Sequence, residues 1–235
     1  MILPRRKLLR LAAPALILPH RRANAQGGMM PGPGTPHTAA ACPGGSTFAL
    51  IASTHIAGNS GGTTPAIDTT CANLLITVMT TSSSGVAPTD SRGNTWTLLP
   101  DYGSPNSYIC YSTPTSVGSG HTFTISNGFS AMQVTAWSGA ASSSPFDVQT
   151  GNFSPTAGPL TPSQNNSLLI TGFSTSGSGI PSVSGGFTIS SYDQASAGVY
   201  FGSASAYLIQ TTAVSATATW SIPTGAGCSM AAFKP

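Results

Sequence analysis

One stretch of the sequence occurs twice, and this repeat limits the chain to a fold built from matching halves. The first copy runs from Asn73 to Gly139, opens with NLLITVMTT and closes with MQVTAWSG. A weaker copy opens at Asn166 with NSLLITGFSTS and closes with CSMAAF. Solenoid repeats are shorter, at about 20–45 residues. The sequence therefore predicts one duplicated β-unit.

From residue 46 onward, short apolar runs alternate with breaks of Ser, Thr, Gly, Pro and Asn, which is typical of an all-β chain. Val, Ile, Thr, Tyr, Phe and Trp dominate these runs, and no window after the first 25 residues shows a helical period. We expect strands at 47–53, 73–81, 94–99, 107–113, 121–126, 131–138, 167–175, 186–191, 198–210, 215–222 and 228–234.

These strands predict an antiparallel, jelly-roll-like β-sandwich over residues 46–235, built from two duplicated halves at about 46–140 and 141–235. Two tandem immunoglobulin-like domains would also fit the length. The joint between the halves is short, and PFDV resumes an apolar run directly after it. We therefore favour a single domain in which the halves bury each other's inner faces.

Charge is scarce and unevenly placed. Charged residues make up 6% of the chain, against roughly 25% in an average soluble protein. Six of the eight basic residues lie within the first 22 positions, which leaves Arg92 and Lys234 against five aspartates in the rest of the chain. Because the body carries no basic patch for phosphates, nucleic-acid binding is not expected.

Residues 1–25 read as a twin-arginine-type signal peptide. The pattern Arg5-Arg6-Lys7-Leu8-Leu9-Arg10 precedes a short apolar run, and Ala23-Asn24-Ala25 is an A-x-A cleavage site. The alternative is a basic amphipathic helix that the mature chain keeps. The apolar run is too short for a membrane span, which needs about twenty residues. We expect an exported protein, in the periplasm, at the cell surface or outside the cell.

Residues 26–45 are rich in Gly and Pro, and this composition predicts a flexible arm. A chain with so little charge lacks a common means of blocking unpaired sheet edges. We therefore expect either homo-oligomerisation or coverage of an edge by this arm.

Four cysteines in an exported chain predict disulfides, and three connectivities are open. First and last strands are often neighbours in a sandwich, so we favour Cys42–Cys228 together with Cys71–Cys110. The spacings do not suit a zinc site. No cofactor is expected.

The segment Asp90-Ser91-Arg92-Gly93-Asn94 reads as a turn before the strand that carries Trp96. Asp bonds to downstream backbone in such turns, and Gly93 suits a left-handed position. Asp90 and Asn94 as calcium ligands are the alternative, but the further carboxylates of a calcium loop are missing. In the second half, Phe187 takes the place of Trp96.

Catalytic motifs are weak. The segment Gly58-Asn59-Ser60-Gly61-Gly62 matches the G-x-S-x-G elbow formally, and His55 and Asp68 would complete a triad with Ser60 on paper. No helix follows Ser60, as that elbow requires. No paired carboxylates suit glycoside hydrolysis, and we expect His121 to face solvent.

Aromatic residues are the remaining indication of a binding role. Tyrosine rings can stack on the apolar faces of sugars, although β-sandwiches also use tyrosines in their cores. The candidate carbohydrate-binding residues are Tyr102, Tyr108, Tyr111, Tyr192 and Tyr200, with Tyr207 as a further tyrosine of this set.

The succession LLITV, TDSRGNTWTLL, SYICYSTPTSVGSGHTFTIS and AMQVTAWSG, followed by PFD, resembles a group of exported bacterial and phage-encoded β-sandwich proteins that is largely uncharacterised. The resemblance covers residues 46–235. It implies a jelly-roll-like fold on a cell or virion surface and brings no catalytic residues. The four cysteines and the low charge depart from that group.

These observations lead to three expectations for function. The first is a non-enzymatic surface or structural module for adhesion or assembly, with a glycan or another surface protein as its partner. The second is a carbohydrate-binding module that uses the tyrosines. The third is a serine hydrolase that uses Ser60.

Overall fold

The computed structural model describes residue 42 and residues 45–83, 85–126, 128, 130–196, 200–221 and 225–235. The predicted signal peptide and nearly all of the predicted arm lie outside these residues, so the expectations about export and edge coverage stay predictions. The described residues contain sixteen strands and no helix, and every strand pairing among them is antiparallel. The prediction of an antiparallel all-β fold is confirmed.

Each half of the chain holds eight strands. The first half contains β1 (Ala49–Gly58), β2 (Gly62–Thr63), β3 (Leu74–Thr81), β4 (Thr89–Asp90), β5 (Thr97–Leu98), β6 (Asn106–Ser112), β7 (Phe123–Ile125) and β8 (Ser130–Ser138). The second half contains β9 (Phe146–Asn152), β10 (Thr156–Leu160), β11 (Ser167–Thr175), β12 (Ser182–Val183), β13 (Thr188–Asp193), β14 (Gly202–Gln210), β15 (Ala216–Ser221) and β16 (Gly225–Phe233).

The two halves have the same topology. The first half forms a five-stranded sheet in the order β1-β8-β3-β6-β5 and a three-stranded sheet in the order β2-β7-β4. The second half repeats both orders, as β9-β16-β11-β14-β13 and β10-β15-β12. Pairing the first strand of a half with its last strand is typical of a jelly roll. The duplication expected from the sequence is therefore present strand by strand.

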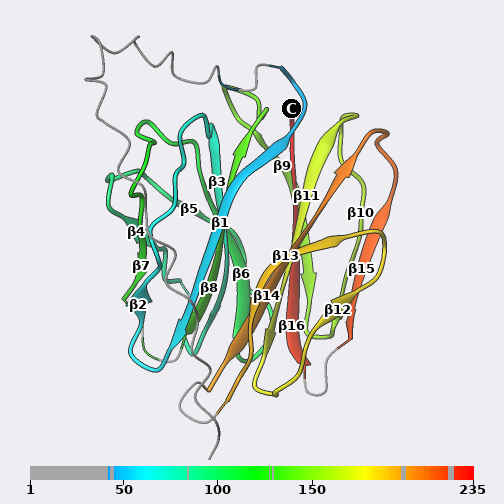
Figure 1. Ribbon diagram of the computed structural model, residues 1–235. Coiled ribbons are helices and arrows are strands. Elements are labelled where there is room, and N and C mark those ends of the chain that lie inside the picture. The colour runs from blue at the N-terminus through cyan, green and yellow to red at the C-terminus, as the bar shows by residue number, and fades with distance from the viewer. Residues whose placement is uncertain are drawn as a thin grey trace, which may run out of the picture. The chain divides into compact units, whose positions relative to one another are not determined.

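The sheets stack in four layers (Figure 1). The two five-stranded sheets face each other, and each three-stranded sheet covers the outer face of its own half. Three apolar clusters fill the spaces: one inside each half and one between the halves. Each half is thus a two-sheet sandwich in itself, and its large sheet is apolar on both faces.

The uninterrupted apolar run of β3 follows from this arrangement. Leu74, Ile76 and Val78 point into the cluster between the halves, whereas Leu75 and Met79 point into the first half. Successive side chains of a strand alternate between its faces, so a strand with two buried faces is apolar throughout. The corresponding strand β11 is fully buried in the same way.

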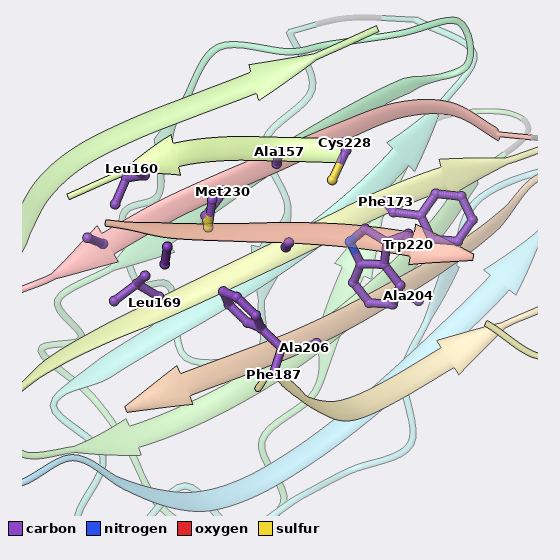
Figure 2. Packing of buried hydrophobic residues seen from close by; sticks show 13 residues of the cluster. Ala157, Leu160, Leu169, Phe173, Phe187, Ala204, Ala206, Trp220, Cys228 and Met230 are labelled. Carbon is purple, nitrogen blue, oxygen red and sulfur yellow. The ribbon is translucent and has the colours of Figure 1, made fainter. Parts of the chain in front are cut away.

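The core of the second half gathers around Trp220 (Figure 2). Its ring lies 5.4 Å from that of Phe173, and Cys228 and Met230 belong to the same cluster. The cluster is otherwise rich in alanine, which lets the two sheets approach closely. Burying each large side chain contributes about 1.5–3 kcal/mol.

Glycines set how closely the halves approach one another. A Cβ at Gly172 of β11 would lie 2.1 Å from Val78 Cγ1 of β3, and a Cβ at Gly151 of β9 would lie 2.1 Å from the Tyr102 ring. The Tyr102 hydroxyl donates to Gln149 Oε1 at 2.9 Å. Tyr102 is therefore part of the joint between the halves.

Five strands were not expected from the sequence. The strands β2, β4 and β12 have two residues each, too few to show a pattern. The residues of β9 are mostly half-exposed, and β10 contains Gly158 and Pro159. Glycine and proline are uncommon in strands, so sequence propensity disfavours β10.

The predicted disulfide pairing is wrong. The structure joins Cys42 to Cys71 and leaves Cys110 and Cys228 as buried free thiols. The prediction assumed that the first and last strands are neighbours, but β1 and β16 belong to different sheets. Cys110 lies mid-strand opposite Thr77, away from Cys71, which precedes β3. The bridge spans a sequence separation of 29 residues, a loop that stabilises by about 3–4 kcal/mol.

Candidate functional site

An open hollow of about 650 Å³ lies where strand β1 of the first half meets strand β13 of the second. We call it the joint hollow. Both strands are at the edges of their five-stranded sheets. Ser53 and His55 are two residues apart on β1, so both side chains point the same way. The other lining residues are Ile189, Ser190, Ser191 and Tyr192 of β13, where a register shift interrupts the pairing with β14.

A short polar network fixes the wall of the joint hollow. His55 Nδ1 lies 2.9 Å from Asp193 Oδ1, and Gln133 Nε2 donates to Asp193 Oδ2 at 2.8 Å. The side chain of His55 is 49% exposed and that of Asp193 is 18% exposed. Both carboxylate oxygens of Asp193 are therefore engaged by protein groups, while much of the imidazole stays open to solvent.

The joint hollow offers hydroxyls, an imidazole and an aromatic ring. Tyr192, on the β13 side of the hollow, is 37% exposed, and Ser53, on the β1 side, is exposed too. The Ser190 hydroxyl donates to the Ser205 carbonyl at 3.0 Å, which orients it. Such a mixture suits a polar, uncharged ligand with apolar faces.

A smaller hollow of about 240 Å³ follows along the chain after β13. We call it the loop hollow, and its lining residues are Ser176, Ser178, Ala195, Ser196 and Tyr200. The Tyr200 N–H donates to Asn59 Oδ1 at 3.1 Å, which ties this loop of the second half to the β1–β2 loop of the first. Tyr200 is 61% exposed.

The five candidate tyrosines do not share one face. Tyr192 and Tyr200 lie in the two hollows. Tyr102 packs at the joint over Gly151, as described above. Tyr111 stacks on Phe146 at 5.6 Å in the cluster between the halves.

Tyr108 is fully buried, and its hydroxyl donates to the Val86 carbonyl at 3.0 Å. Burial raises its pKa above the ordinary tyrosine value. Of the five predicted tyrosines, only Tyr192 and Tyr200 remain as candidates for ligand contact. The other three have structural contacts that only the three-dimensional fold brings about.

The residues of the predicted triad have other partners. His55 pairs with Asp193 rather than with Asp68. Asp68 Oδ1 accepts hydrogen bonds from the backbone and the hydroxyl of Thr70, at 2.9 Å and 2.6 Å. Ser60 is exposed in the loop between β1 and β2. Asp68 therefore does not serve as the carboxylate of a triad with His55 and Ser60.

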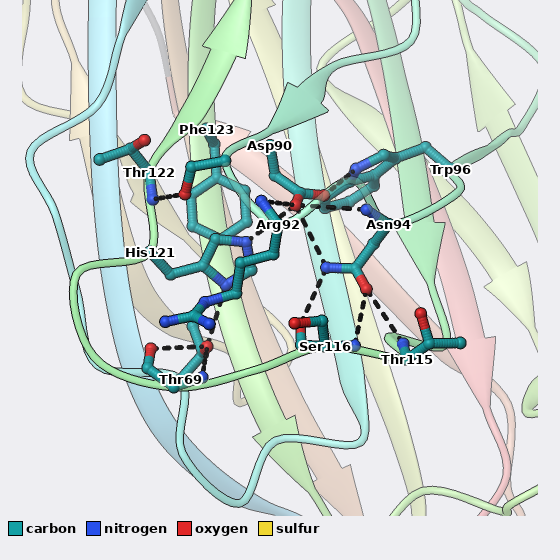
Figure 3. Close-up of polar contacts among 12 residues, drawn as sticks. Thr69, Asp90, Arg92, Asn94, Trp96, Thr115, Ser116, His121, Thr122 and Phe123 are labelled. Atoms are coloured by element: carbon teal, nitrogen blue, oxygen red, sulfur yellow. Dashed lines mark hydrogen bonds and ion pairs between the residues drawn. The ribbon is translucent and has the colours of Figure 1, made fainter.

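The Asp90 hairpin forms a buried polar network (Figure 3). Asp90 Oδ1 accepts from Arg92 N at 2.8 Å and from Asn94 Nδ2 at 3.2 Å, and Asp90 Oδ2 accepts from Trp96 Nε1 at 2.8 Å. His121 Nε2 lies 3.1 Å from Asp90 Oδ1, with both side chains fully buried. Burial by itself would raise the pKa of Asp90, but these hydrogen bonds outweigh it and hold the pKa below its usual value.

The turn interpretation of this hairpin is confirmed. Gly93 has φ 70°, the left-handed position expected for it, and its N–H donates to the Asp90 carbonyl at 3.2 Å. Asn94 Oδ1 accepts from Thr115 N and Ser116 N, both at 3.0 Å, and so ties the turn to a neighbouring loop. With N–H donors on both Asp90 oxygens, the structure favours a turn over a calcium site.

The expectation that His121 faces solvent is wrong. It is fully buried, stacks on Phe123 at 4.4 Å and is hydrogen-bonded through Nδ1 to Thr69 Oγ1 at 2.9 Å. The alternation of polar and apolar residues around β7 does not show that its polar side is buried too. That side is covered by loops that lie far away in the sequence.

The second half replaces this polar network with apolar packing. Val183 pairs with Trp220 in the place where Asp90 pairs with Phe123. Phe187 precedes β13 as Trp96 precedes β5, and it lies in the apolar core. The Asp90 network therefore serves the architecture of one half, and no ligand role is needed to explain it.

No family model, curated protein or solved structure matches this chain. Within the described residues, no group of three or more His, Cys, Asp or Glu side chains could hold a metal ion. The same part of the chain has no helix of sufficient length and apolar character to cross a membrane.

Sequence reasoning missed Asp193 and Gln133. His55 and Asp193 are 138 residues apart in sequence, so no local sequence pattern predicts their pairing. The only available signal was the repeat itself, because two halves that pack together must meet at strand edges.

Proposed function

We propose that this chain is an exported, non-enzymatic surface module that binds a neutral carbohydrate in the joint hollow. The observation that carries the proposal is the exposed Tyr192 ring in a hollow that also presents Ser53 and His55. An aromatic face stacks on the apolar face of a sugar ring, and hydroxyl and imidazole groups exchange hydrogen bonds with sugar hydroxyls.

Charge supports a neutral ligand. The Asp193 carboxylate contacts His55 of the joint hollow, and His55 and Gln133 engage both of its oxygens. Among the described residues, neither Lys nor Arg lines the joint hollow. An anionic ligand would lack a fixed cationic partner there, and a metal ion would lack a set of ligands.

Three features support export. The twin-arginine pattern and the cleavage site lie at the start of the chain. The Cys42–Cys71 disulfide suits an oxidising compartment. The resemblance to exported β-sandwich proteins suits a cell or virion surface. A role in adhesion through surface glycans unites the first two expectations from the sequence.

A glycan array followed by titration calorimetry tests the proposal. We expect binding to at least one neutral glycan, and at least about a tenfold loss of affinity in Tyr192→Ala, as is usual when a central aromatic contact is truncated. Phe153→Ala is the matched control, because Phe153 is 73% exposed and lies outside both hollows. Equal binding by wild type and Tyr192→Ala would contradict the site. Binding to none of the glycans would contradict the function.

The His55–Asp193 pair also resembles the His–Asp pair that supplies the general base of a catalytic triad. Hydrolysis is therefore a second candidate function. A fluorophosphonate probe separates the two. We expect no covalent labelling of the wild type. Labelling that Ser60→Ala or His55→Ala abolishes would favour the hydrolase instead.

A further inference from the structure

The loop hollow continues the joint hollow along one segment of chain. Tyr192 lines the first, and Ala195, three residues later, lines the second. Three residues of extended chain span at most about 11 Å. The two hollows are therefore close enough for one elongated ligand to occupy both.

Both hollows have the same chemistry. Each presents an exposed tyrosine ring, Tyr192 or Tyr200, beside serine hydroxyls. The described residues that line the loop hollow include no Asp, Glu, Lys, Arg or His. A repeating ligand with apolar faces and hydroxyl edges fits such a repeated pattern. An anionic or cationic polymer does not, because neither hollow presents a cluster of opposite charge.

Contacts between the halves fix the two tyrosines relative to each other. Tyr192 is next to Asp193, which His55 and Gln133 of the first half hold. The backbone of Tyr200 is held by Asn59 of the first half. The backbone of Tyr192 also pairs with Ala204 of β14. Both rings therefore stand on anchored backbone, which lowers the entropy that a bound ligand must remove.

We propose that the joint hollow and the loop hollow are two subsites for one neutral oligosaccharide, with Tyr192 and Tyr200 each stacking on a different sugar unit. This inference rests on the proposed function. It adds that the ligand is an oligosaccharide long enough to fill both hollows, and that Tyr200 makes affinity depend on its length. Short sugars occupy the Tyr192 subsite alone, and longer chains gain the Tyr200 contact.

The test is calorimetry with neutral homo-oligosaccharides of one to six units, namely β-1,4-linked glucose, α-1,4-linked glucose and β-1,4-linked N-acetylglucosamine. Wild type should bind longer chains at least about tenfold more tightly than the shortest chain that binds. Tyr200→Ala should remove that gain and leave the affinity for the shortest chain unchanged. Phe153→Ala should behave as wild type in the whole series.

Two results would overturn the inference while leaving the proposed function intact. In the first, Tyr200→Ala keeps the full gain with length. In the second, Tyr200→Ala weakens the shortest and longest chains equally, which would place both rings in a single site. Absence of binding by every oligosaccharide would instead overturn the proposed function, and the inference with it. Unchanged melting curves for both variants establish that they are folded.

Discussion

Single residues of the first half show where sequence reasoning is sufficient and where it stops. The turn role of Asp90 could be predicted, because its partners Arg92 and Asn94 are its sequence neighbours. Its burial against His121 could not, because β4 and β7 must pair before the two side chains meet. The same limit applies to the cysteines, whose pairing depends on which sheet each strand joins.

Replacing Asp90 with Asn should lower the free energy of unfolding by about 1–3 kcal/mol at pH 7, because buried donors lose a charged acceptor. The pKa of Asp90 is lower in the folded chain than its ordinary value. Its contribution is therefore complete above the unfolded carboxyl pKa of about 3.9 and is lost as the pH falls through the folded value.

Urea unfolding of wild type and Asp90→Asn between pH 7 and pH 2 measures the contribution of the Asp90 charge to stability. The difference between the two proteins should shrink as the pH falls below about 4. The matched control is Asp68→Asn, since Asp68 is an exposed turn aspartate and should change stability less. A difference that stays constant down to pH 2 would show that the Asp90 charge contributes nothing.

The free thiols of Cys110 and Cys228 should not react in the folded protein. Burial raises the pKa of both to about 12, so almost no thiolate exists at pH 8. A thiol reagent should label no cysteine in the native protein. In non-reducing denaturant it should label Cys110 and Cys228. Peptide mapping should join Cys42 to Cys71. Rapid labelling of native protein, or a Cys42–Cys228 peptide, would contradict the structure.

At the scale of elements, the strands with long apolar runs could be predicted, and three of the two-residue strands could not. The apolar runs of β3 and β8 are long enough to identify, and their predicted ranges agree with the structure to within a few residues. The two-residue strands β2, β4 and β12 exist only because a neighbouring strand pairs with them. Their prediction requires the tertiary fold.

The crossing of β3 and β11 should tolerate no extra side chain. Gly172→Ala would place a Cβ 2.1 Å from Val78 Cγ1. Overpacking of this kind costs about 1–3 kcal/mol, and urea unfolding should show it. Gly128→Ala is the control, because in the described part of the chain nothing lies within 4 Å of a Cβ there. Equal stability of the two variants would mean that the halves do not approach as closely as described.

At the scale of the whole molecule, duplication creates the candidate site. Neither half contains the joint hollow alone, because Ser53 and His55 come from one half and Tyr192 from the other. The sequence showed the repeat but could not show which edges meet. The described halves face each other through their large sheets, so the edges of β1 and β13 come together and Asp193 reaches His55.

Nuclear magnetic resonance of protein with labelled tyrosine and histidine rings tests most directly whether a neutral sugar binds where the halves meet. With a neutral oligosaccharide at saturation, the ring signals of Tyr192, Tyr200 and His55 should shift. The signals of buried Tyr108 and His121 should stay in place. Binding that leaves the Tyr192 and His55 signals unmoved would show that the sugar does not bind in the joint hollow.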